Sequence, residues 1–92
     1  MTVVWTDGAR EDLRSVLADL GAYLESHARR VGEEADKAAA RLAAFPRSGR
    51  IVPEWESDEL REVIVDRFRL VYRIVGDSVV FLTFHPAAIP LP

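Results

Sequence analysis

The chain contains no cysteine. This absence excludes disulfide bridges, thiolate nucleophiles and cysteine-rich zinc sites, and it suits a reducing compartment. Proline and glycine are scarce, with five of each among 92 residues, and no segment is repetitive, which excludes collagen-like and low-complexity chains. Because apolar residues make up 49% of the chain and charged residues 29%, the composition favours one globular domain spanning residues 1–92.

Long apolar runs are also missing. A membrane-spanning helix needs roughly 18 or more consecutive apolar residues, and no stretch of this sequence approaches that length. Met1 is followed almost at once by Val3, Val4 and Trp5, without the basic region and apolar core of a signal peptide. We therefore expect a cytoplasmic protein without a membrane partner.

An excess of positive charge is missing as well. The 12 basic residues face 15 acidic ones, a net charge of -3, whereas dedicated nucleic-acid binders carry basic surfaces that release counterions. The overall charge therefore argues against RNA as the main partner. From residue 67 onward, however, Arg67, Arg69 and Arg73 stand against Asp77 alone, so any anionic partner is expected at this segment.

Two helices are predicted from the spacing of apolar residues. A short apolar run at residues 3–5 predicts a strand, after which Thr6 or Asp7 can cap a helix. Apolar residues then recur at helical spacing along two successive stripes, and Pro46 ends the second. The small residues of the second stripe predict close packing in a helical hairpin. The first stripe contains Ala9, Leu13, Val16, Leu17, Leu20, Tyr23 and Leu24, and the second contains Val31, Ala35, Ala38, Ala39, Leu42 and Phe45.

Near the C-terminus the side-chain pattern repeats every two residues, as in a β-strand. This pattern predicts three antiparallel strands, at residues 60–66, 67–75 and 78–84. Residues 46–58 hold turn formers and are predicted to be a connecting loop. Trp55, inside this loop, either fastens the loop to the domain or contacts a partner. The two helices should pack on one face of this small twisted sheet, which defines an α+β fold.

The Gly76-Asp77 pair predicts a two-residue hairpin turn of type II′, because glycine stands first. This turn sets Val75 opposite Ser78 and fixes the register of both strands. Regular pairing continues as Ile74–Val79, Arg73–Val80, Tyr72–Phe81, Val71–Leu82, Leu70–Thr83 and Arg69–Phe84. One face then holds Phe68, Leu70, Tyr72, Ile74, Val79 and Phe81. Since two helices cover only one face, the second is predicted to expose a protein-binding surface between arginines, made of Val71, Val80, Leu82 and Phe84.

Several segments, in this order of elements, match a known pattern. They are Trp5-Thr6, residues 42–50 (LAAFPRSGR), residues 60–63 (LREV) and residues 67–77 (RFRLVYRIVGD). With them the chain resembles, over nearly its full length, the RelE/ParE superfamily of bacterial toxins, and within it the ParE-like branch. The resemblance implies the toxin of a type II toxin-antitoxin system, of the kind involved in plasmid stabilisation, which inhibits growth until a cognate antitoxin binds it.

The resemblance leaves three activities open. A ParE-like toxin would bind DNA gyrase, for which it needs a protein-binding surface and no catalytic group. A RelE-like toxin would instead cleave mRNA on the ribosome, using clustered basic residues with a tyrosine or histidine. The third alternative is an inactive protein with the toxin fold that binds only its antitoxin. None of these activities implies a cofactor.

The C-terminus departs from the superfamily pattern. Relatives often carry His-Gly followed by two basic residues, whereas here His85 is followed by Pro86, Ala87 and Ala88. Without the basic pair, mRNA cleavage becomes the less favoured activity, and the ribosome the less favoured partner. Neither His85 nor His27 has partners at metal-ligand spacing, so no metal site is expected.

These patterns place the predicted binding site for target or antitoxin on the second sheet face. Arg61 matches an arginine position of the superfamily, and it either contacts a partner or pairs with a neighbouring acid such as Glu59 or Glu62. Arg69 and Arg73 flank an apolar position on one strand face. The binding candidates are Arg61, Arg69, Val71, Arg73, Val80, Leu82 and Phe84. Under the nuclease alternative, the catalytic candidates are Arg61, Arg73 and His85.

Overall fold

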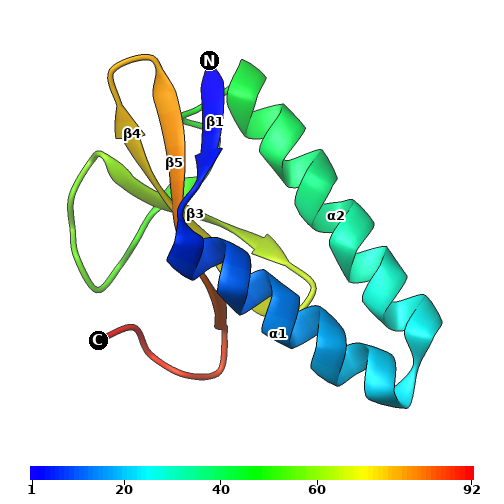
Figure 1. Ribbon diagram of the computed structural model, residues 1–92. Coiled ribbons are helices and arrows are strands. Elements are labelled where there is room, and N and C mark those ends of the chain that lie inside the picture. The colour runs from blue at the N-terminus through cyan, green and yellow to red at the C-terminus, as the bar shows by residue number, and fades with distance from the viewer.

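Two layers make up the structure, a five-stranded sheet and a helical hairpin that covers one of its faces (Figure 1). The computed structural model describes all residues, 1–92. The strand order is β1-β5-β4-β3-β2, with β1 parallel to β5 and the other neighbours antiparallel. The elements are β1 (Thr2–Trp5), α1 (Asp7–Tyr23), α2 (Glu25–Ala44), β2 (Arg50–Ile51), β3 (Leu60–Val65), β4 (Phe68–Val75) and β5 (Ser78–Pro86). The predicted α+β fold is confirmed, although strand β2 is absent from the prediction.

The start of α1 is fixed by Thr6, one of the two predicted caps. Its hydroxyl accepts a hydrogen bond from the Ala9 N–H at 3.1 Å and donates to the Phe81 carbonyl at 2.7 Å. The first contact satisfies an unpaired N–H of the first helical turn. The second fastens the helix to β5, so the position of α1 on the sheet is set at its N-cap.

The main core lies between the helical hairpin and the sheet. Small residues of α2, such as Ala35 and Ala38, are buried in this core. Neither helix has the length and apolar character that a membrane crossing requires. The buried residues of this core are Ala9, Val31, Ala35, Ala38, Leu42, Val63, Val65, Leu70, Tyr72, Val79, Phe81 and Phe84.

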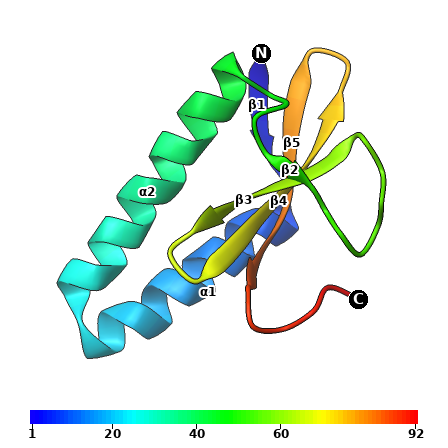
Figure 2. The same cartoon turned by 180° about the vertical axis from the view of Figure 1, so that it is seen from behind.

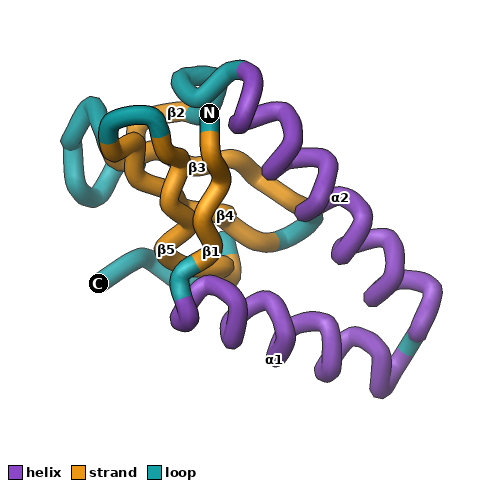
Figure 3. The backbone as a smooth tube through the Cα atoms, turned by 45° about the horizontal axis from the view of Figure 1, so that its top comes forward, coloured by secondary structure: helices purple, strands orange, loops and turns teal.

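Three residues of the predicted stripes lie outside the core. Tyr23, Leu24 and Phe45 are 91%, 58% and 66% exposed. The tip of the helical hairpin projects beyond the sheet (Figure 3), so Tyr23 and Leu24 have no second layer to pack against. Phe45 follows the last helical residue with φ -132, and its side chain therefore leaves the line of the stripe. The predicted burial of these three residues is wrong.

The β4–β5 hairpin begins in the predicted register. Gly76 has φ 53 and Asp77 does not share the positive φ, as a type II′ turn requires. The pairs from Val75–Ser78 to Tyr72–Phe81 form as predicted. A β-bulge then leaves Leu82 without a partner. The later pairs are Val71–Thr83, Leu70–Phe84, Arg69–His85 and Phe68–Pro86, so the predicted pairs Val71–Leu82, Leu70–Thr83 and Arg69–Phe84 are wrong.

The bulge moves Phe84 to the other face of the sheet. One inserted residue exchanges the two faces for every residue that follows it. Phe84, predicted on the exposed face, is 2% exposed and belongs to the main core. Its ring stacks on Phe68 with centroids 4.9 Å apart.

The second face of the sheet is covered by the chain itself. The loop before β3 and the last residues of the chain both lie on the side away from the helices (Figure 2). Val52, Val71 and Leu91 form a second buried cluster there, with Trp55 packed against it. The predicted exposure of Val71 is therefore wrong, while Trp55 fastens the loop, as the first of its two interpretations proposed.

Candidate interaction surface

A network of charged residues lies on the second face, centred on Arg69. Its Nε donates to Glu62 at 2.7 Å, and its two terminal nitrogens donate to the carboxylate of Glu54 at 2.6 and 2.7 Å. Arg50 binds the other oxygen of Glu62 at 2.6 Å. Arg69 is 5% exposed and Glu62 is 1% exposed, so the charges neutralise one another away from water.

This network corrects the predicted role of Arg69. The residue was predicted to border an accessible binding surface, but all three nitrogens of its guanidinium bind carboxylates inside the protein. The hydrogen bonds that Arg69 donates to Glu54 and Glu62 raise the pKa of Arg69 further. Arg69 thus joins the 46–58 loop to the sheet and is not available to a partner.

Glu54 gives the network a pH dependence. Hydrogen bonds from Arg69, and then from the Leu91 N–H, lower the pKa of Glu54 from 4.5 to about 2. Because folding lowers this pKa, the contribution of Glu54 to stability is complete above pH 4.5 and is lost as the pH falls towards 2. We expect Glu54→Gln to flatten the pH dependence of the free energy of unfolding in this range. Urea unfolding at several pH values measures it, with Glu33→Gln as the charge-matched control; identical pH profiles for Glu54→Gln and the wild type would contradict it.

Arg61 also forms its hydrogen bonds within the protein. Its Nη2 binds the Asp58 carboxylate at 2.8 Å, and its Nη1 donates to the Gly49 carbonyl at 3.0 Å. The side chain is 13% exposed. The second interpretation of Arg61, pairing with a neighbouring acid, agrees with the structure, although the acid is Asp58 rather than Glu59 or Glu62. Arg61 clamps both ends of the loop to the start of β3.

Tyr72 lies beside this clamp, fully buried as predicted. Its hydroxyl donates to the Pro46 carbonyl at 2.6 Å and accepts from the Gly49 N–H at 3.1 Å. Burial raises the pKa of Tyr72. The tyrosine therefore holds the loop as a neutral phenol.

The candidate catalytic residues do not converge. His85 binds the Ile89 carbonyl at 2.8 Å and pairs across the sheet with Arg69. Arg73 lies four residues further along β4, about 13 Å away at the usual strand rise. Arg61 is held in the loop clamp. Two of the three side chains are thus held by internal hydrogen bonds, and Arg73 lies apart from His85 along the sheet.

Part of the predicted binding surface remains accessible, at the turn end of the second face. Arg73 is exposed and stands in register between Leu60 and Val80, which are half-buried. Val75, two residues further on, is 52% exposed. Leu82, the bulge residue, is half-buried beside this region. We call four of these residues the hairpin patch: Leu60, Arg73, Val75 and Val80.

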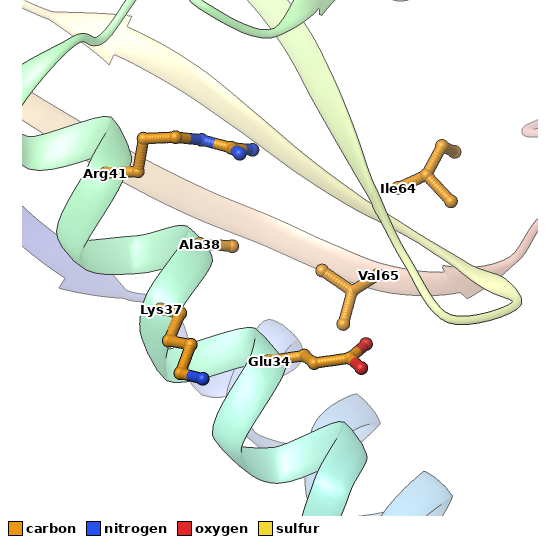
Figure 4. A pocket seen from close by; sticks show the side chains of 6 residues that line it. All are labelled: Glu34, Lys37, Ala38, Arg41, Ile64 and Val65. Atoms are coloured by element: carbon orange, nitrogen blue, oxygen red, sulfur yellow. The ribbon is translucent and has the colours of Figure 1, made fainter.

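A groove of about 340 Å³ separates α2 from β3. Figure 4 shows Val65 pointing towards α2 and Ile64 pointing away from it. Strand β2 pairs only with Arg61 and Glu62, so the outer edge of β3 is unpaired beyond them. The register places the N–H and C=O of Ile64 on this open edge. The groove is lined by Glu34, Lys37, Ala38, Arg41, Ile64 and Val65.

Comparisons with known proteins identify the family. Residues 3–88 match the model of the ParE toxin of type II toxin-antitoxin systems, parDE. The chain belongs to the ParE toxin family. A ParE-like fold is also found in a solved structure described as the chromosomal ParDE TA system from P. aeruginosa, which shares 18% sequence identity. The match covers 94% of this chain and 95% of that chain, with a TM-score of 0.76. No curated protein matches.

The resemblance to ParE toxins inferred from sequence is thus confirmed, and membership implies an antitoxin partner. Sequence reasoning missed several residues of the second face. Leu60 and Val75 carried a signal, because both are apolar residues of the predicted strands; Leu60 pairs with Arg73, and Val75 lies two residues from Arg73 on the same strand. Glu54 and Leu91 could not be identified from the sequence, because they lie in segments where apolar residues do not recur at helical or strand spacing.

Proposed function

We propose that this ParE-family protein inhibits bacterial growth by binding a protein target, DNA gyrase, in the cytoplasm, and that a cognate antitoxin neutralises it. The observation that carries the proposal is the dispersal of Arg61, Arg73 and His85. A nuclease needs such groups around one phosphate, whereas two of the three are held by internal hydrogen bonds. A toxin that acts by binding needs only an accessible surface.

The hairpin patch is the surface we assign to the target. Arg73 takes part in none of the ion pairs of the structure, and Leu60 and Val80 flank it. A cation surrounded by aliphatic side chains is typical of residues that dominate binding energy at protein interfaces. An acidic partner surface would gain both the charge and the apolar contact.

We expect Arg73→Glu to weaken inhibition of gyrase about 100-fold or more, because the reversed charge would be desolvated against an acidic partner. Supercoiling of a relaxed plasmid by purified gyrase measures this effect. Arg10→Glu, an exposed reversal on α1, is the control and should inhibit like the wild type. Equal inhibition by both variants would show that the target binds elsewhere, and no inhibition by the wild type would exclude gyrase.

The antitoxin is assigned to the groove and the open edge of β3. An extended segment can pair with the free backbone groups of Ile64, as in other complexes where a peptide adds a strand to a sheet. Lys37 and Arg41 from α2 line the same groove, so an acidic segment fits it best.

Hydrogen exchange tests this assignment on the complex with the product of the neighbouring gene. The amide of Ile64 should become protected at least about 100-fold when the antitoxin binds, since it would gain a hydrogen bond that the isolated toxin lacks. The amides of β1, at the opposite edge of the sheet, are the internal control. Protection confined to β1 would place the antitoxin on the other edge.

A further inference from the structure

Residues 87–92, which we call the tail, bury one side chain against the second face. Leu91 is 7% exposed and packs with Val52 and Val71. Its N–H donates to Glu54 at 3.0 Å, and the indole N–H of Trp55 donates to the backbone oxygen of Pro92 at 3.0 Å. This end of the tail is therefore bound as a peptide ligand is bound, because one apolar side chain is buried and the backbone is hydrogen-bonded on both sides of it.

The tail is also suited to this role by its own chemistry. Pro90 and Pro92 flank Leu91, and proline fixes its own φ while it holds the preceding residue in an extended conformation. Such segments lose little entropy on binding, and they are recognised by aromatic-lined grooves. The Trp55 indole, which donates to the backbone oxygen beside the buried leucine, has the donor and the apolar surface that this recognition needs.

The rest of the tail buries no side chain and is held through its backbone: the Ala87 N–H donates to the Arg67 carbonyl at 2.9 Å, and His85 bonds the Ile89 carbonyl at 2.8 Å. Ala87, Ala88 and Pro90 are exposed, and Ile89 is 55% exposed. Segments held by few buried contacts open locally at much lower cost than the whole domain unfolds. The site beneath Leu91 can therefore be vacated while the sheet and the main core stay folded.

We propose that Val52, Glu54, Trp55 and Val71 form a peptide-binding site for an extended, proline-flanked leucine. The tail occupies this site in cis, and a partner protein that carries a segment of the same chemistry enters by displacing it. This site shares no residue with the hairpin patch or the groove at β3, although it adjoins the patch through the hydrogen bond from Val52 to Leu60. The proposal does not depend on gyrase as the target.

Binding of a labelled peptide with the sequence of the tail, AAIPLP, tests the proposal. In the full chain, Leu91→Asp should release the tail, because a carboxylate cannot be buried beside Val52 and Val71. We expect this variant to bind the peptide at least about tenfold more tightly than the wild type, in which the tethered tail competes at a high effective concentration. Fluorescence anisotropy measures both affinities, and Ile89→Asp, at an exposed position, is the matched control that should bind like the wild type.

Specificity is tested with a second peptide, AAIPDP, and with Trp55→Phe in the Leu91→Asp chain. Both changes should weaken binding, the first by removing the buried leucine and the second by removing the indole donor. If the Leu91→Asp chain is folded by circular dichroism and does not bind AAIPLP, or binds both peptides equally, the proposal is wrong. If that chain does not fold, AAIPLP is titrated into the wild type at millimolar concentration, where the Trp55 indole NMR signal should shift; an unchanged signal overturns the proposal.

Discussion

Arg69→Met should lower the free energy of unfolding by about 3 kcal/mol or more, because it leaves a buried carboxylate without its main partner. Glu62 is 1% exposed and keeps only Arg50, whose side chain is 62% exposed. Glu54 loses both of its contacts with the guanidinium. Methionine retains the apolar volume of the arginine stem, so the effect reports on charge rather than on packing. Urea unfolding at neutral pH gives the value.

Arg73→Met is the matched control for this prediction. It makes the same replacement on the same strand face, but at an exposed position, where substitutions usually change stability by less than about 0.5 kcal/mol. The double variant Arg69→Met with Glu62→Leu should recover part of the loss, since it removes the carboxylate as well as its partner. Equal effects at positions 69 and 73 would contradict the structural role of Arg69.

Gly49→Ala should destabilise the protein by about 2 to 4 kcal/mol through a clash and a lost hydrogen bond. A Cβ at this position would lie 2.5 Å from the Tyr72 hydroxyl and 2.7 Å from the Glu62 carbonyl oxygen. The second atom belongs to the backbone of β3 and cannot rotate away. Relief of the clash requires the loop to move, which breaks the bond from the Gly49 N–H to Tyr72. The midpoint of thermal unfolding should fall by roughly 8 to 30 °C, at roughly 4 to 8 °C per kcal/mol for a domain of this size.

Gly21→Ala provides the comparison for this substitution. Its added Cβ would meet only the Ala28 side chain, at 3.8 Å, and alanine favours a helix over glycine by roughly 1 kcal/mol. A slight stabilisation is therefore expected from the same chemical change. If Gly49→Ala melts at the wild-type temperature, the close packing of the loop on Tyr72 does not exist in solution.

The helices and the three-stranded meander were predictable because each depends on spacing within a short segment. The Gly76-Asp77 turn likewise fixed the register as far as Tyr72. Beyond that point the bulge at Leu82 decided the register. Periodicity cannot reveal it, because Leu82 and Phe84 are apolar and fit either face. One unpaired residue placed Phe84 in the core rather than on the predicted surface.

The candidate site was harder to predict for a different physical reason. Apolar residues on both faces of β4 and β5 indicate that both faces are covered, but they do not say by what. We assigned the cover of Val71 to a partner protein, whereas the loop around Val52 and the tail at Leu91 supply it. The buried position of Arg69 depends on Glu54, and a loop without periodicity gives no sign of where such a residue will lie.

The parallel pairing of β1 with β5 has a consequence for how the protein is made. Residues 2–5 pair with residues 78–81, so the first strand to leave the ribosome waits for the last before it can join the sheet. Contacts between such distant parts of a chain carry a large loop-closure cost and form slowly. The helical hairpin can form early, but its packing surface is complete only when β5 has emerged. During synthesis the nascent chain therefore exposes an unfinished core, and binding functions that need the whole sheet begin only after translation has passed residue 81.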